Sequence, residues 1–167
     1  MIVLGVDPGI AIVGYGIIEY KNNSFKVLSY GAITTPAKTK LSSRIKIIHD
    51  DISELIRKYS IEALAIEELF FNKNVKTAID VAHARGVIMV SAVNNNIPVY
   101  EYTPLQVKQG VVGYGRAEKK QIQEMVKIIL NLNSIPKPDD VADGLALAIC
   151  HCHSINHSDL FLSLIHI

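Results

Sequence analysis

The order of strand-like and helix-like segments constrains the fold of this chain more than any other feature. Three segments rich in β-branched and aromatic residues come first, over 2–6, 12–20 and 25–34. Apolar residues then recur at steps of three and four over 41–59, which is the pattern of an amphipathic helix. The chain therefore begins with an antiparallel meander that a helix follows.

Strands and helices alternate in the rest of the chain. The pattern predicts strands over 61–69 and 98–102 and helices over 75–93, 104–112, 117–130 and 140–151. A meander followed by such alternation predicts an α/β fold with a mixed five-stranded sheet and helices on both faces. The 167 residues suffice for one domain. We assign residues 1–153 to that domain and residues 154–167 to a C-terminal tail.

Charge and cysteine content limit the kind of binding surface and the cellular compartment that we expect. The formal net charge is +1, so any surface that binds a polyanion must be local. Cys150 and Cys152 are too close together on a helix for an easy disulfide, which fits a reducing compartment. Strand-like residues begin at Ile2 in place of a secretion signal, and no run reaches the ~18 apolar residues of a membrane span. We therefore expect a cytoplasmic protein.

Acidic residues stand at the ends of two buried strands. Asp7 ends the first strand directly before Pro8-Gly9, and Glu67-Glu68 ends the fourth. If these two strands are neighbours in the sheet, Asp7 and Glu67 lie side by side. Taken alone, Asp7 is a typical turn residue, and the glutamates are typical of a solvated strand end.

A second acidic cluster opens the last predicted helix. Asp140 and Asp143 are three residues apart and share one helix face, while Asp139 precedes them. A helix cap would explain Asp139-Asp140 alone. If the first turn of this helix packs over the strand ends, four mutually repelling carboxylates meet there, and a hard cation such as Mg²⁺ or Mn²⁺ would neutralise them. The combination favours a metal site.

Five sequence blocks resemble the RuvC family of Holliday junction resolvases, with matching order and spacing up to about His153. They are "GVDPG", "AIEELFFNKN", "ARGV", "VKQGVVGYGRAEKKQI" and "DDVADGLALAICHCH". The resemblance implies a ribonuclease H-like fold and a symmetric homodimer that resolves four-way DNA junctions by paired symmetric nicks in recombination and repair. It also implies a branch-migration complex as partner, formed by a junction-binding protein and a hexameric ATPase motor.

The resemblance also implies the residues that carry the chemistry. The family's metal-binding carboxylates match Asp7, Glu67, Asp140 and Asp143, although some members have histidine at the last position. We expect Asp7 to bridge two Mg²⁺ ions, with Mn²⁺ able to substitute, Glu67 to hold one ion, and the Asp140/Asp143 pair to hold the other. Two such ions about 3.5–4 Å apart hydrolyse phosphodiesters by in-line displacement. The implied products carry 5′-phosphate and 3′-hydroxyl ends.

A local basic segment provides candidates for DNA contact, namely Lys108, Arg116, Lys119 and Lys120. The family's functional lysines match Lys108, to which we assign a backbone contact, and Lys119, to which we assign a catalytic role near the scissile phosphate. The alternative is a solvated helix face balanced by glutamates. Phe70 matches a family aromatic that distorts the junction, and its alternative role is in the core.

Two further segments leave alternatives open. The small apolar residues of the helix over 74–93, which include Ala78, Val81, Ala82 and Ala84, suit packing across a dimer axis, or the helix simply covers the sheet. The "CHCH" run at 150–153 lacks the second pair of ligands that a structural zinc site needs. Helix packing and a positively biased helix end are its expected roles.

Three other functions compete with junction resolution. An actin-like phosphotransferase also places an acid and glycines after its first strand, but it requires a duplicated domain. A non-catalytic junction-binding module has no reason to collect four carboxylates near phosphate. A related ribonuclease H-like nuclease acting on another branched or hybrid substrate stays open, because fold and metal chemistry do not determine the substrate.

Overall fold

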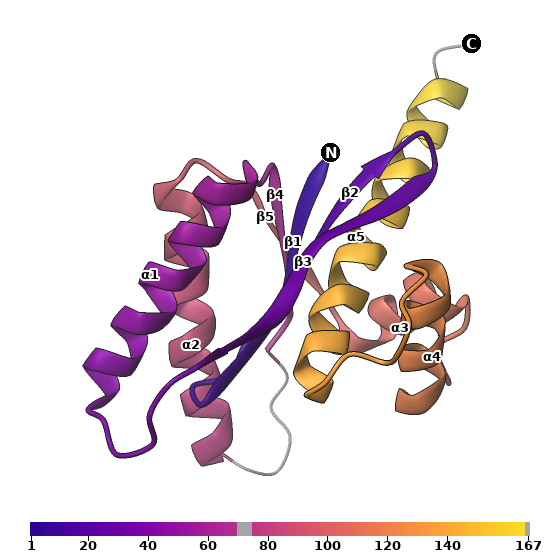
Figure 1. Ribbon diagram of the computed structural model, residues 1–167. Helices are drawn as coiled ribbons and strands as arrows, with labels where there is room; N and C mark the ends of the chain where they lie inside the picture. The colour runs from indigo at the N-terminus through magenta and orange to yellow at the C-terminus, as the bar shows by residue number, and fades with distance from the viewer. Residues whose placement is uncertain (70–74, 166–167) are drawn as a thin grey trace.

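A mixed five-stranded sheet forms the centre of the molecule (Figure 1). The computed structural model describes the backbone of residues 1–69 and 75–165 and the side chains of residues 1–69 and 75–155. The strands are β1 (Ile2–Asp7), β2 (Ile12–Lys21), β3 (Ser24–Thr34), β4 (Ala63–Glu67) and β5 (Val99–Tyr102), in the order β3-β2-β1-β4-β5. β1, β2 and β3 pair antiparallel, whereas β4 is parallel to both β1 and β5. The predicted mixed sheet is confirmed.

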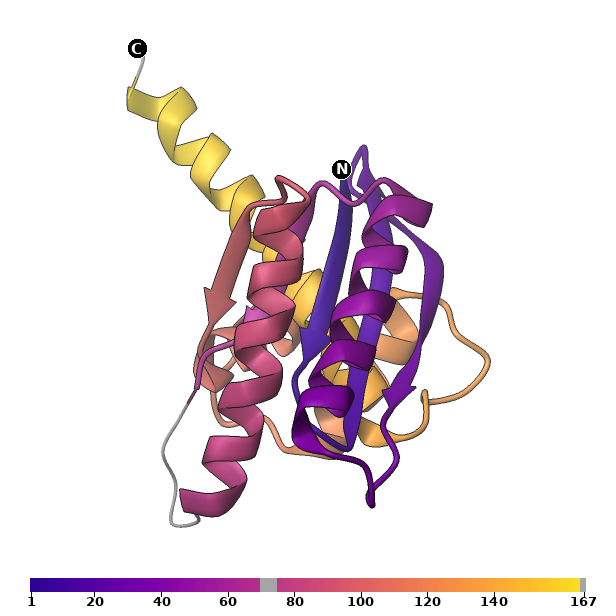
Figure 2. The ribbon, with the colours of Figure 1, turned by 90° about the vertical axis from the view of Figure 1, so that its left-hand side faces the viewer.

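Helices cover both faces of the sheet, as predicted. On one face lie α1 (Leu41–Tyr59) and α2 (Val75–Asn94). On the other lie α3 (Pro104–Val112), α4 (Lys119–Ile129) and α5 (Asp139–Ile165) (Figures 1 and 2). α5 continues well beyond the predicted end at residue 151, so the boundary that we assigned at residue 153 lies within one helix. None of the helices, over the residues that the structure describes, is long and apolar enough to cross a membrane.

The side chains of β1 and β4 alternate between the two faces, as the pleat requires. Leu4 and Ile66 pack with the cluster under α1 and α2, whereas Val3 and Ala65 pack with the cluster under α5. Asp7 and Glu67 are spaced by even steps from Val3 and Ala65 along their strands. Their side chains therefore belong to the α5 face.

α5 lies unusually close to β1. A Cβ atom built on Gly5 would lie 2.0 Å from the carbonyl oxygen of Gly144, so neither strand nor helix could keep its place with a side chain there. This approach of two backbones at a pair of glycines fixes the height of α5 above the sheet.

The "CHCH" run packs α5 against its neighbours. Cys150, His151 and Cys152 are buried, and a 2.7 Å hydrogen bond joins the Tyr102 hydroxyl to Nδ1 of His151. His153 Nδ1 lies 2.7 Å from the carbonyl oxygen of Gly110 in α3. The expected role in helix packing is confirmed, but the expected position at a helix end is wrong because α5 extends to Ile165.

Candidate active site

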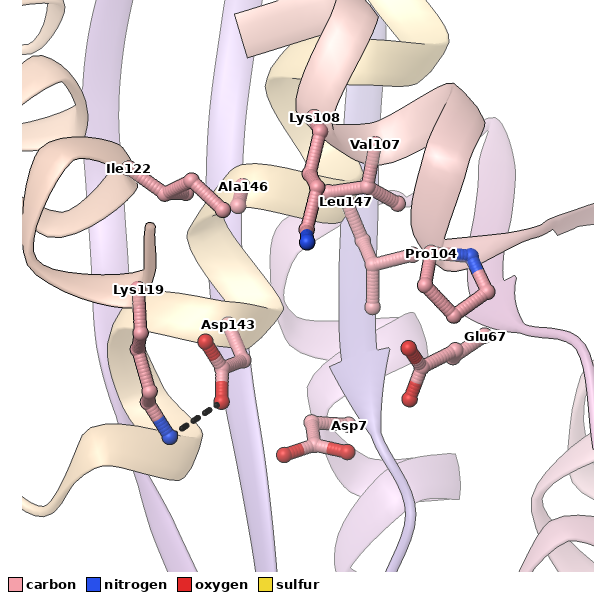
Figure 3. A pocket seen from close by; sticks show the side chains of 10 residues that line it. All are labelled: Asp7, Glu67, Pro104, Val107, Lys108, Lys119, Ile122, Asp143, Ala146 and Leu147. Carbon is pink, nitrogen blue, oxygen red and sulfur yellow. Dashed lines mark ion pairs between the residues drawn. The ribbon is translucent and has the colours of Figure 1, made fainter. Parts of the chain in front are cut away.

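The ends of β1 and β4 bring Asp7 and Glu67 together. The two strands are parallel neighbours, with Val6 opposite Ile66 in the register, and the next residues along them are Asp7 and Glu67. Figure 3 shows both carboxylates directed into the same space. The sequence-based expectation that these strands are adjacent is confirmed.

The first turns of α5 complete the acidic cluster. Asp143 lines a cavity of about 220 Å³ together with Asp7 and Glu67 (Figure 3). Asp140, one turn earlier, is near enough to raise the pKa of both Asp7 and Asp143. The four carboxylates that lie far apart in the sequence therefore interact with one another in the folded protein.

Burial and mutual repulsion make the ionised carboxylates costly. Burial, followed by the charges of Asp143, Glu67 and Asp140, raises the pKa of Asp7 from 3.8 to about 8. Burial and the charge of Asp143 raise the pKa of Glu67. Burial also raises the pKa of Asp143, although a lysine opposes the effect. A positive charge placed among these groups would relieve the repulsion.

Lys119 supplies part of that charge from the first turn of α4. Its Nζ lies 3.3 Å from Oδ2 of Asp143 and 3.4 Å from Oδ2 of Asp139. Burial lowers the pKa of Lys119, but the two aspartates outweigh it and the net shift is upward. Asp139 also pairs with Lys137 at 3.3 Å. Asp139, which the sequence analysis treated only as a neighbour of Asp140, therefore orients a lysine of the site.

The donor set fits a hard divalent cation. Among the side chains of residues 1–69 and 75–155, no three His, Cys, Asp or Glu stand close enough together to hold a metal ion in this arrangement. The side chains that converge on the cavity are nevertheless carboxylates, whose oxygens are the ligands that Mg²⁺ and Mn²⁺ prefer. The raised pKa of Asp7 shows that this cluster favours added positive charge, whether a proton or a metal ion.

The remaining predicted DNA-contacting residues divide into three groups. Lys108 lines the cavity, with its ammonium group above the carboxylates (Figure 3). Arg116 is exposed in the loop before α4, and Lys120 borders a separate surface hollow with Glu118 and Glu124. Phe70 lies outside the described residues. Lys108 and Lys119 are thus brought to the carboxylates, whereas Lys120 is directed elsewhere.

Two residues outside the predicted set of site residues lie against backbone carbonyl groups of that set. A Cβ atom on Gly14 would lie 1.9 Å from the carbonyl oxygen of Asp140, so only glycine allows α5 to begin where it does. Nε of Arg85 donates a hydrogen bond of 3.1 Å to the carbonyl oxygen of Glu67. The available signal for Arg85 was a single basic residue within an otherwise largely apolar stretch of its helix.

Known proteins resemble this chain over almost its whole length. The family described as "Crossover junction endodeoxyribonuclease RuvC" matches residues 3–151. The crossover junction endodeoxyribonuclease RuvC of Clostridioides difficile (strain 630) is 64% identical over 154 residues, which cover 92% of this chain and 91% of the relative.

Solved structures agree with the sequence match. The Thermus thermophilus RuvC structure superposes with a TM-score of 0.89 at 34% identity, covering 95% of this chain and 97% of that chain. T. thermophilus RuvC in complex with Holliday junction substrate gives a TM-score of 0.86 at 32% identity, covering 94% and 96%. The expected ribonuclease H-like fold is confirmed, and the chain belongs to the RuvC family of crossover junction endodeoxyribonucleases.

Proposed function

We propose that this protein is a metal-dependent endonuclease that resolves four-way DNA junctions, using the carboxylates at the ends of β1 and β4 and in the first turns of α5. The convergence of Asp7, Glu67 and Asp143 on one cavity, with Lys108 and Lys119 at its wall, carries the proposal. Acids alone would repel DNA, but acids that hold cations beside two lysines can receive a phosphodiester. The RuvC of T. thermophilus solved with a Holliday junction substrate supports this choice of substrate.

Each residue of the site has a defined task in this proposal. Asp7, Glu67, Asp140 and Asp143 hold the divalent ions, which we take to be two Mg²⁺ with Mn²⁺ as a substitute. Two such metal ions, when bound, would activate a water molecule and stabilise the leaving oxygen of an in-line displacement at phosphorus. Lys119 and Lys108 contact phosphate oxygens, and the ion pair of Lys119 with Asp143 holds its ammonium group at the edge of the carboxylates.

We further propose that two copies act together as a homodimer through α2. Its exposed residues Val75, Ile79, Ala82, Gly86, Val90 and Val93, here called the α2 stripe, follow one another at steps of three and four along one side of the helix. Val75 and Val93 are 68% and 63% exposed, which is unusual for such residues on a surface that meets only water. A symmetric dimer would bury the same stripe on both copies.

Gly86 supports this assignment independently. A Cβ atom on Gly86 would meet nothing within 4 Å among the residues that the structure describes, so their packing does not require glycine there. Glycine in a helix interior costs about 1 kcal/mol relative to alanine. Close approach of a second backbone would explain it. Two residues named from the sequence for this role, Ala78 and Ala84, are instead buried, and Ala84 packs with the cluster under α1 and α2.

The remaining partners and the location follow from the same proposal. A junction-cutting enzyme works where junctions are moved, which supports a branch-migration complex of a junction-binding protein and a hexameric motor as its partner. The free buried cysteines and the chromosomal substrate support a cytoplasmic location.

Cleavage assays on three substrates test the nuclease proposal. Purified protein is incubated with a synthetic four-way junction, a linear duplex and an RNA–DNA hybrid, each with Mg²⁺ or with EDTA. We expect paired symmetric nicks on the junction alone, only with Mg²⁺, and none with Asp7→Asn. Preferred cleavage of the hybrid would favour the other ribonuclease H-like activity, and junction binding without cleavage would favour the non-catalytic module.

Sedimentation analysis of variants tests the dimer. Ile79→Glu places a charge in the α2 stripe and should give a monomer that binds the junction weakly and loses paired nicking. Arg57→Glu on the exposed side of α1 is the matched control and should stay dimeric. A dimeric Ile79→Glu variant with paired nicking would contradict the assignment of α2.

A further inference from the structure

The backbone that carries Glu67 is held at the very end of β4. The amide of Glu68 donates a 2.9 Å hydrogen bond to the carbonyl oxygen of Tyr102 in β5. The carbonyl oxygen of Glu67 accepts a 3.1 Å hydrogen bond from Nε of Arg85 in α2. Glu67 is therefore held from the neighbouring strand and from a helix on the opposite face to its carboxylate.

Arg85 is itself held in place by a third element. Its Nη2 pairs with Oε1 of Glu101 in β5, and the Arg85 side chain is only 16% exposed. Glu101 stands opposite Ile66 in the register of β4 and β5. The guanidinium thus joins α2, β4 and β5 at one point, using two of its donors in a fixed fork that a lysine lacks.

The direction of a metal-holding carboxylate depends on the backbone beneath it. A shift or twist of the strand end would carry the Cα–Cβ bond of Glu67 with it and displace the carboxylate from the cavity that Asp7 and Asp143 share. Among the described residues, Arg85 and the β5 hydrogen bond hold the backbone of this strand end.

We propose that Arg85 is a positioning residue, which sets the orientation of Glu67 by holding its carbonyl oxygen and so determines how tightly the site binds divalent cations. The inference rests on the proposed role of Glu67 as a metal-holding carboxylate. It assigns no contact between Arg85 and the DNA. Groups that orient metal ligands typically change metal affinity by about 10–100-fold when they are removed.

A rival role for Arg85 also has support in the structure. Arg85 borders a hollow of about 500 Å³ that reaches Asp7 and Glu67, and an arginine at such a place can bind a phosphate. The two roles differ in a measurable way. A DNA contact affects junction binding without metal, whereas a positioning contact affects metal binding without DNA.

The experiment compares Arg85→Gln, Arg85→Lys and Glu101→Gln with wild type. Mn²⁺ binding is measured by calorimetry on DNA-free protein, junction binding is measured in EDTA, and single-turnover junction cleavage is measured over a series of Mg²⁺ concentrations. Arg57→Gln on α1 removes one positive charge far from the site and serves as the control.

We expect both Arg85 variants to bind Mn²⁺ about 10–100-fold more weakly. Cleavage should be restored by higher Mg²⁺ concentration, and junction binding in EDTA should match the Arg57→Gln control. Arg85→Lys should show the same loss as Arg85→Gln, because one ammonium cannot serve both partners in the fork geometry. Glu101→Gln should shift Mn²⁺ binding in the same direction by a smaller factor.

Other results would overturn the inference. Unchanged Mn²⁺ affinity together with weaker junction binding would identify Arg85 as a DNA contact. If circular dichroism shows that Arg85→Gln fails to fold, Glu101→Gln decides, and wild-type Mn²⁺ affinity in that variant rejects the proposal. Glu67→Gln tests the proposed metal site separately from the role of Arg85. If this variant binds Mn²⁺ as wild type does, the proposed metal site itself is wrong.

Discussion

Gly14 and Asp140 meet backbone to backbone at the edge of the active site. Gly14 is opposite Asp7 in the register of β1 and β2, and a Cβ atom on it would lie 1.9 Å from the carbonyl oxygen of Asp140. No real Cβ contact is that short, so any other residue would displace the start of α5. Gly14 lies in β2, beside Asp7 of β1, and its lack of a side chain allows α5, which carries Asp140 and Asp143, to begin next to Asp7.

We predict that Gly14→Ala lowers junction cleavage by about 100-fold, since a misplacement of about 1 Å can have that effect on a catalytic geometry. Single-turnover cleavage with saturating Mg²⁺ measures it. Gly31→Ala on β3 is the matched control, because the three atoms nearest to its Cβ would belong to the Tyr15 side chain, the hydroxyl being nearest at 3.1 Å. Full activity in Gly14→Ala would show that α5 can shift without harm.

Asp7→Asn should abolish cleavage and stabilise the metal-free protein. In the folded state the Asp7 carboxyl keeps its proton up to a pKa of about 8, whereas the unfolded chain releases it near 3.8. The folded state therefore binds more protons between these values, so stability falls as pH rises from about 4 to about 8. Thermal unfolding in EDTA should show a higher Tm for Asp7→Asn near pH 8 and little difference near pH 4.

Thermal unfolding with added Mg²⁺ in place of EDTA should instead favour the wild-type protein over Asp7→Asn. Divalent cations should raise the Tm of wild type, because a ligand that binds only the folded state stabilises it. The Asp7→Asn variant should respond less. An equal Mg²⁺ response in both proteins would mean that Asp7 does not contribute to the metal site.

Substitutions of Lys119 and of Asp139 should differ greatly in how far they lower the rate of junction cleavage. Lys119→Met removes the cation beside Asp143 and the phosphate contact, and we expect a loss of at least about 100-fold. Asp139→Asn removes only the exposed ion pairs with Lys119 and Lys137, each of which contributes about 0–1 kcal/mol and is screened by salt. We therefore expect less than about a 10-fold loss for Asp139→Asn. Equal losses would show that Lys119 acts only when Asp139 holds it.

His151 should make the protein sensitive to acid. Burial lowers its pKa from 6.5 to about 4, so the unfolded state binds more protons between these values and stability falls as pH drops from about 6.5 to 4. The loss amounts to about 3 kcal/mol if the whole shift is expressed. Urea unfolding from pH 7 downward measures it. In His151→Gln this part of the pH dependence should disappear, whatever the change in stability at pH 7.

Local patterns in the sequence were enough to predict the sheet, the helices and two of the site's strand ends. Alternation with a period of two and recurrence at three and four residues reflect the backbone geometry of strands and helices, which needs no knowledge of the rest of the fold. Asp7 and Glu67 stood out because a charge at the end of a buried strand interrupts such a pattern. The extent of α5 was underestimated, since its apolar residues lie on all sides and its end carries no stop signal.

Contacts between backbone atoms distant in the chain were decided only in the folded protein. No periodicity reveals that Gly14 touches Asp140, or that Arg85 reaches the carbonyl oxygen of Glu67, because every residue type presents the same carbonyl group. Likewise, the pairing of Lys119 with Asp139 and Asp143 depends on where α4 lies over α5. The sequence thus determined which chemical groups are available, and the packing of helices on the sheet decided which of them meet.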